Sequence, residues 1–217
     1  MNFLAHAAPY LHEPWVAIGS CVPDWLSAVD RKIRARRRMA EEFLDSGDEV
    51  LASVATGICH HIDDDRWFHG SEAFTTMNLQ LAVELRDLLP GDRGFRPMFV
   101  GHILIEMLLD AHRIRRTPEV CDRFYEILSS ADHEQTQAAV NKITGRPTDK
   151  LVDVIQRFTE IEFLRDYLDV ERLLFRLNQV MKRVKLDPLP TQLSEWLLKT
   201  DTRVGEHYER LLAGPQS

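Results

Sequence analysis

Hydrophobic residues recur at intervals of three and four along most of the chain, the spacing that places them on one face of an α-helix. The clearest run follows Asp48, with apolar residues at Val50, Leu51, Val54, Ile58 and Ile62. No run of alternating β-branched residues bounded by turn residues competes with this pattern. The pattern therefore predicts an all-α protein, a multi-helix bundle.

Proline and glycine residues separate the expected helices. Besides the helix that begins near residue 48, we predict helices over residues 2–11, 72–89, 99–110, 117–130, 132–143, 147–186 and 191–212. Pro23-Asp24 is expected to break the chain before a basic helix that continues to the Ser46-Gly47 turn. With 217 residues and 44% hydrophobic content, the chain has enough apolar material for one core, which predicts a single domain over residues 1–217.

The net charge and the cysteine content argue against several classes of function and location. A net charge of −7 opposes general affinity for nucleic acid or anionic lipid, and the longest apolar run is too short to span a bilayer. Three cysteines without a Cys-x-x-Cys pair indicate a reducing compartment. No lysine or arginine precedes Arg31, unlike in a signal peptide. We therefore expect a soluble, cytoplasmic protein that binds neither nucleic acid nor membranes.

Residues 31–38 form a concentrated basic block in this acidic chain, Arg-Lys-Ile-Arg-Ala-Arg-Arg-Arg. Such a block can dock an acidic partner, with Arg34, Arg37 and Arg38 as candidate contacts. A solvated helix face is the other interpretation, and the sequence leaves both open.

Two triplets of histidine and acidic residues carry the candidate chemistry. His61, Asp65 and His69 form the first, and His102, Glu106 and Asp110 form the second. On a helix, side chains four residues apart stack along one face, so each triplet can converge on one ion. The first triplet also fits the polar face of a surface helix. The second interrupts an apolar segment, where carboxylates are rare unless paired, protonated or bound to metal.

The two triplets together predict an internal metal site. Imidazole and carboxylate ligands without thiolate suit manganese, iron or zinc, and they are more typical of catalysis than of a structural zinc site. We expect one or two divalent ions, which would activate water and polarise a phosphoryl or acyl oxygen.

The opening Met1-Asn2-Phe3-Leu4-Ala5-His6, followed by residues 19–24 (Gly-Ser-Cys-Val-Pro-Asp), resembles the acyl carrier protein phosphodiesterase family. Residues 57–65 resemble that family's Gly-Ile-His-x-His-x-x-x-Asp stretch, with His61 on the second histidine and Asp65 on the aspartate. His102 falls where the family has a histidine in a hydrophobic helix, and residues 167–190 resemble its C-terminal segment.

The resemblance implies an HD-like, all-helical metal-dependent hydrolase that removes 4′-phosphopantetheine from acyl carrier protein by cleaving a phosphodiester. The metal ligands or their supports would be His6, Asp24, His61, Asp65 and His102, and Asp24, His61 and Asp65 would act in catalysis. Acyl carrier protein is acidic, which would suit the basic block. Cys59 stands in place of the family's first histidine, and His69 and Glu106 lie outside the family pattern, so we predict them as metal ligands from spacing alone.

Three functions remain open from the sequence. The first is a metal-dependent phosphodiesterase or phosphohydrolase acting on acyl carrier protein, another acidic protein or a small phosphodiester. The second is a helical di-iron carboxylate redox protein, although its usual Glu-x-x-His spacing is missing. The third is a non-catalytic module that binds an acidic protein.

Overall fold

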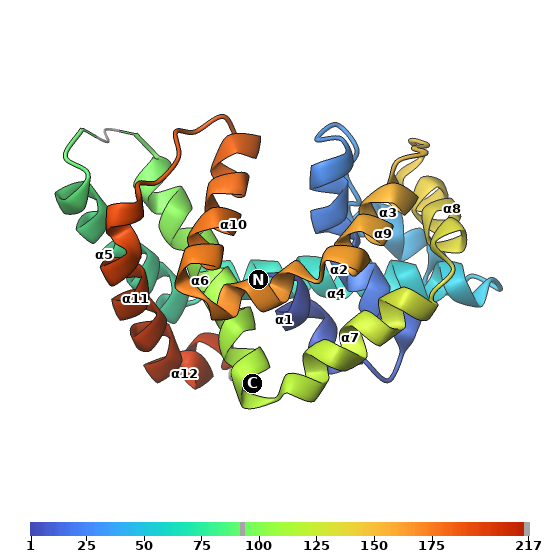
Figure 1. The fold of residues 1–217 in the computed structure, drawn as a ribbon. Helices are drawn as coiled ribbons and strands as arrows, with labels where there is room; N and C mark the ends of the chain where they lie inside the picture. Colours follow the sequence, from blue (N-terminus) through green and yellow to red (C-terminus); the bar gives the residue numbers. More distant parts are fainter. Residues whose placement is uncertain (92–93, 215–217) are drawn as a thin grey trace. The chain divides into compact units, whose positions relative to one another are not determined.

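The computed structural model describes residues 1–91 and 94–214, which form helices joined by loops (Figure 1). No residue in these two ranges belongs to a strand, so the prediction of an all-α fold is confirmed. None of the helices in the described part is both long and apolar enough to cross a membrane.

By its internal contacts the chain divides into two compact units. Unit 1 comprises Met1, Phe3–Arg66 and Thr117–Glu162, and unit 2 comprises Asn2, Trp67–Arg116 and the residues from Phe163 onward. Compact units of this size occur both inside one domain and as separate domains, so the single domain over residues 1–217 stays a prediction.

Unit 1 is built around a cluster of aromatic rings. Its helices are α1 (Phe3–Ala7), η1 (Ala8–Tyr10), α2 (Pro14–Val29), α3 (Arg37–Ala40), η2 (Glu41–Phe43), most of α4 (Glu49–Gly70), α7 (Pro118–Ser130), α8 (His133–Thr144) and α9 (Leu151–Ile161). The ring of Phe158 lies 4.7 Å from Phe3, 5.6 Å from Trp25 and 6.1 Å from Phe124, measured between centroids. Helices α1, α2, α7 and α9 therefore share one core, which fixes where α1 and α2 present their polar residues.

Unit 2 is centred on the packing of α5 against α6. Its helices are the last turn of α4, α5 (Glu72–Leu88), α6 (Arg96–Arg116), η3 (Phe163–Leu168), α10 (Val170–Arg183), η4 (Thr191–Leu193), α11 (Ser194–Glu206) and α12 (Tyr208–Leu212). Two hydrogen bonds also join α5 to α11, where Glu84 accepts from Trp196 Nε1 (2.8 Å) and Arg203 Nη1 (2.7 Å). These contacts hold α5 beside α6, the helix that carries His102 and Glu106.

Short-range signals set several helix ends. Pro14 occupies the first position of α2, where its missing N–H costs nothing. The Ser71 hydroxyl caps α5 by accepting from the N–H of Phe74 at 3.2 Å. Gly145, with φ of 62°, ends α8 in the left-handed conformation that glycine adopts freely.

The predicted break at Pro23-Asp24 and the predicted basic helix are both wrong. Helix α2 continues through Pro23 to Val29, because the burial of neighbours such as Val22 and Trp25 outweighs the one hydrogen bond that proline removes. Residues 31–36 are not helical, since the Asp30 carboxylate accepts from the N–H of Lys32 at 2.8 Å and forms a local turn instead. Only α3 is helical within the basic block.

The expected helix over residues 147–186 is divided into three. Helix α9 ends at Ile161, because the next residue, Glu162, has a φ of 46° outside the right-handed helical region. After η3, the Asp169 carboxylate starts α10 by accepting from the N–H groups of Glu171 (3.1 Å) and Arg172 (3.0 Å).

Candidate metal centres

Helices α2 and α4 approach each other closely in unit 1, and two glycines permit it. A Cβ atom on Gly57 of α4 would lie 2.6 Å from the backbone nitrogen of Ser20 and would overlap Val16 as well. A Cβ atom on Gly19 of α2 would lie 2.9 Å from Val54 Cα. Any side chain at these positions would push the helices apart, so the glycines bring the backbone of α2 within reach of His61.

His61 lies one turn after Gly57 and is almost completely buried, with 4% exposure. Its Nδ1 atom donates to the carbonyl oxygen of Ser20 at 2.7 Å. Ser20 lies next to Gly19, whose carbonyl lacks its helical donor because Pro23 has no N–H. Fixing the proton on Nδ1 leaves the Nε2 lone pair facing Asp65, 3.5 Å from Oδ2. A histidine whose second nitrogen is held by a carbonyl is the usual arrangement of a metal ligand.

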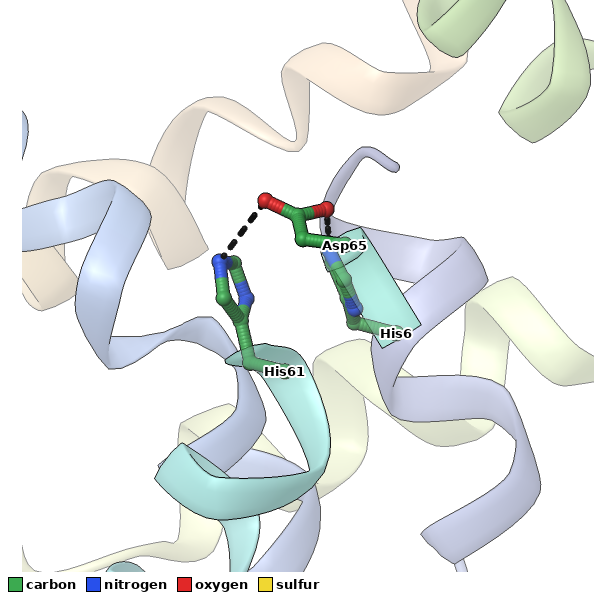
Figure 2. Close-up of side chains that lie close together, drawn as sticks. All are labelled: His6, His61 and Asp65. Carbon is green, nitrogen blue, oxygen red and sulfur yellow. Dashed lines mark ion pairs between the residues drawn. The ribbon is translucent and has the colours of Figure 1, made fainter. Parts of the chain in front are cut away.

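His6 brings α1 to the same place (Figure 2). Its ring is fully buried and stacks on His61 with 4.0 Å between centroids. Its Nε2 atom lies 3.2 Å from Asp65 Oδ1, and its Nδ1 atom lies 3.6 Å from Asp64 Oδ2, beyond hydrogen-bond distance. Buried Nδ1 therefore has no hydrogen-bond partner among the described residues. Asp65 Oδ1 also lies 2.5 Å from the amino nitrogen of Met1.

The protonation states of His61 and Asp65 suit a cation. Burial, together with the charge of His6, lowers the pKa of His61 to about 3, so its imidazole is neutral at pH 7. Burial raises the pKa of Asp65, but the hydrogen bond from His6 and nearby positive charge outweigh burial and hold it well below its usual range. Burial lowers the pKa of His6, yet the nearby carboxylates of Asp64 and Asp65 raise it overall, so His6 would release its proton when it binds a metal. A neutral imidazole and an ionised carboxylate are the forms that bind metal.

The donor atoms of His6, His61 and Asp65, the unit 1 group, lie within 4.8 Å of one another. The two histidines are buried, whereas the side chain of Asp65 is 32% exposed. One edge of the group is therefore open to solvent. The residues fit a divalent ion with three protein ligands and a free position, the arrangement of catalytic rather than structural sites.

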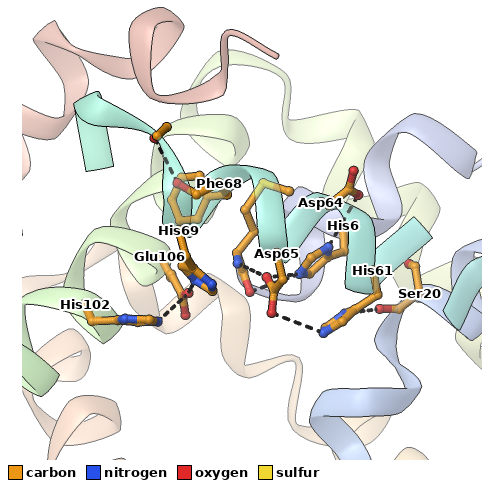
Figure 3. A network of polar contacts seen from close by, with 11 residues as sticks. His6, Ser20, His61, Asp64, Asp65, Phe68, His69, His102 and Glu106 are labelled. Carbon is orange, nitrogen blue, oxygen red and sulfur yellow. Dashed lines mark hydrogen bonds and ion pairs between the residues drawn. The ribbon is translucent and has the colours of Figure 1, made fainter. Parts of the chain in front are cut away.

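A second group of the same composition lies in unit 2, formed by His69, His102 and Glu106 (Figure 3). The Nε2 atoms of His69 and His102 lie 2.8 Å and 3.0 Å from the same Glu106 oxygen, Oε1. Glu106 is 8% exposed; burial raises its pKa, but positive charge and the hydrogen bonds from the two histidines outweigh burial and keep it well below its usual range. The ring of Phe74 packs against His102 at 5.0 Å and His69 at 5.1 Å and covers one side of this unit 2 group.

The structure thus places six of the predicted ligands in two groups, and two predicted residues in neither. Asp24 lies half-buried in α2, and Asp110 lies fully buried in α6. The role of Asp24 as ligand or catalytic residue stays a prediction. The expectation that ligand-forming groups of histidine and carboxylate exist is confirmed, while the identity of the metal stays a prediction.

The pattern of side chains in the sequence did not predict the hydrogen bond between His61 and the Ser20 carbonyl. Ser20 contributes a backbone carbonyl, which no side-chain pattern reveals. Gly19 and Gly57 were the available signal, because glycine inside an amphipathic helix costs stability and marks a close approach of two backbones.

Comparisons of the chain with protein-family models, curated proteins and solved structures find no match. The similarity to the acyl carrier protein phosphodiesterase family and the HD-like fold therefore stay predictions from the sequence.

Proposed function

We propose that the chain is a metal-dependent hydrolase of phosphodiesters, with its metal bound by His6, His61 and Asp65. The observation that carries the proposal is the hydrogen bond from His61 Nδ1 to the Ser20 carbonyl, which aims Nε2 at the position shared by the other two donors. A divalent ion bound there supplies Lewis-acid chemistry, by lowering the pKa of water and polarising a phosphoryl oxygen.

The residues around this site determine its access to solvent, the orientation of His6 and the metals that it suits. His6 and His61 close its buried side and exclude water there, and Asp65 forms the exposed edge at which a substrate arrives. Asp64, 3.6 Å from His6 Nδ1, favours the orientation that turns His6 Nε2 toward Asp65. With nitrogen and oxygen donors alone, the site suits manganese, iron or zinc.

Adjacent histidines on α4 give a matched test. His61→Ala removes a donor of the unit 1 group, whereas His60→Ala changes a half-buried neighbour whose ring stacks on Tyr10 at 4.5 Å. Titration calorimetry with Mn²⁺, Zn²⁺ and anaerobic Fe²⁺ measures the metal affinity of both variants. Loss of a residue that only supports a ligand lowers metal affinity by roughly 10–100-fold, so His61→Ala should lower it by at least as much. His60→Ala should leave the metal affinity unchanged. Hydrolysis of bis(p-nitrophenyl) phosphate should follow the same order.

In a chain whose unit 2 group is disabled by His102→Ala, metal affinity that survives His61→Ala and Asp65→Asn would refute the assignment. A metal-loaded protein that cleaves no phosphodiester would also refute it. The resemblance in the sequence makes holo acyl carrier protein the first natural substrate to test. Release of 4′-phosphopantetheine is measured as a mass loss from that protein, and its absence alongside cleavage of the aryl diester would redirect the proposal to a small phosphodiester.

The unit 2 group favours a second candidate function, iron-dependent oxygen chemistry. Two histidines and one carboxylate converge on a single point, the ligand set of mononuclear non-haem iron rather than of a di-iron centre. Protein loaded with Fe²⁺ without oxygen and exposed to nitric oxide should then give the electron paramagnetic resonance signal of an iron nitrosyl. A His102→Ala variant with an undiminished signal would exclude this function for the unit 2 group.

A further inference from the structure

A cavity of about 190 Å³ opens in unit 1 among residues of the basic block and the end of α8. Its lining consists of Lys32, Arg34, Arg36, Arg38, Met39, Thr144 and Arg146. Five of these side chains are cationic, and no acidic residue is among them. In a chain with net charge −7, such a concentration of positive charge around one hollow calls for an explanation.

The fold separates one arginine of the block from the others. Arg37 turns toward α4, where it pairs with Asp63, and it also pairs with Glu41 at 2.8 Å. Arg38, the next residue of α3, projects about 100° away from that contact, and Arg36 precedes the helix in extended backbone. Fixing Arg37 on α4 thus directs its two neighbours to the cavity.

Two further contacts hold the wall of the cavity in place. The side chain of Ile33 is buried, 7% exposed, and anchors the irregular stretch between α2 and α3. On the opposite side, Arg146 Nη1 donates to the carbonyl oxygen of Lys32 at 3.3 Å. Helix α3 packs against α8, so the two walls belong to one compact unit.

No carboxylate of residues 1–91 or 94–214 pairs with the arginines that line the cavity. Within the described residues, the guanidinium groups of Arg34, Arg36 and Arg38 form no ion pair with a carboxylate, unlike that of Arg37. Like charges held this close repel one another, and an anion between them would remove the repulsion. Guanidinium groups offer paired N–H donors that match phosphate oxygens.

We propose that this cavity binds a small anion of the phosphate class with two or more negative charges, such as a diphosphate. The volume equals that of roughly six water molecules at about 30 Å³ each, which accommodates a diphosphate group. The predicted docking residues are thereby reassigned: Arg34 and Arg38 contact the anion together with Lys32, Arg36 and Arg146, and Arg37 supports them from α4.

Titration calorimetry of the full chain with inorganic pyrophosphate, in metal-free low-salt buffer, tests the proposal. One pyrophosphate should bind per chain, more tightly than orthophosphate or sulfate, and added NaCl should weaken binding. Arg38→Ala and Arg146→Ala should each lower the affinity about tenfold or more, the typical effect of removing one charge-assisted hydrogen bond. Arg34→Lys keeps the charge but loses the fork of donors and should give a smaller loss.

Lys150→Ala is the matched control, since Lys150 is an exposed cation four residues from Arg146 that does not line the cavity. Its affinity for pyrophosphate should equal that of the unchanged protein. Far-UV circular dichroism identifies any variant that has lost its helices, and Arg34→Lys retains the fold if an alanine variant does not.

Three results would overturn the proposal: no binding at millimolar pyrophosphate, an equal loss in Lys150→Ala, or unchanged affinity in both Arg38→Ala and Arg146→Ala. Poly-glutamate that binds while pyrophosphate does not would also overturn it, in favour of an acidic protein as the partner. The titrations contain no metal, so their outcome is independent of the proposed hydrolase activity.

Discussion

Replacing Gly57 by alanine tests the contact on which the unit 1 group depends. The new Cβ would lie 2.6 Å from Ser20 N and 2.8 Å from Gly19 C, whereas ordinary contacts begin at 3.4 Å. These are backbone atoms, so no side-chain rotation relieves the overlap. Helices α2 and α4 must therefore separate by more than the roughly 0.8 Å that Ser20 N alone requires (the difference between 3.4 and 2.6 Å), because the Val16 carbonyl oxygen would lie closer still.

Two free-energy terms oppose each other in this variant. Overpacking of this kind costs about 1–3 kcal/mol, and rigid backbone places the substitution near the upper end. Alanine in a helix recovers about 1 kcal/mol relative to glycine. The expected net loss is about 2 kcal/mol in the free energy of unfolding. The same movement lengthens the His61–Ser20 hydrogen bond from 2.7 Å to beyond about 3.5 Å, so the bond is lost.

Urea unfolding followed by far-UV circular dichroism measures the loss of stability, and Mn²⁺ titration measures the effect of the lost hydrogen bond on metal affinity. Gly70→Ala is the control, because Gly70 lies at the end of the same helix and no atom of the described residues lies within 4 Å of an added Cβ. Gly57→Ala should be less stable than Gly70→Ala and should bind Mn²⁺ about 10–100-fold more weakly. A Gly57→Ala protein within about 0.5 kcal/mol of the unchanged chain and with full metal affinity would refute the reasoning.

Two further predictions concern pH and unit 2. Because burial and the charge of His6 lower the pKa of His61 from 6.5 to about 3, the unfolded chain takes up a proton in this range that the folded chain does not. Metal-free protein should thus lose stability as the pH falls from about 6.5 towards 3 in urea titrations, and an undiminished loss in His61→Gln would contradict this. In unit 2, Glu84→Ala should cost about 1–3 kcal/mol in thermal or urea unfolding, because the buried Trp196 Nε1 and the half-buried Arg203 lose their acceptor. Glu84→Gln keeps an acceptor for Trp196 and should cost less, so equal losses would count against that hydrogen bond.

Most of the helical organisation could be predicted from the sequence, because the apolar spacing and the stop signals act over a few residues. The helix bearing His61 and Asp65 and the apolar helix bearing His102 and Glu106 lie where the pattern predicts. The errors at Pro23 and in the basic block have a common cause. Local propensity predicts a break at proline and a helix in the charged block, whereas burial of the α2 side chains and the turn at Asp30 determine the conformation of these residues.

The candidate ligands were predictable as residue types, but their grouping was not. Spacing along α4 predicts that His61, Asp65 and His69 share a helix face, and they do belong to one helix. The structure nevertheless assigns His69 to the unit 2 group with His102, and His61 and Asp65 to the unit 1 group with His6. Spacing within a helix says nothing about which distant segment packs beside each turn.

The sequence by itself determined an all-α chain with histidine and carboxylate side chains four residues apart on two helices, because helix geometry is local. Only the tertiary structure decided that His6 stacks on His61 and that the Ser20 carbonyl sets the tautomer of His61. It also brought Arg146 beside the basic block, over one hundred residues away in sequence. These contacts depend on the packing of helices through Gly19, Gly57 and the buried cores, a property of the whole chain that no local pattern contains.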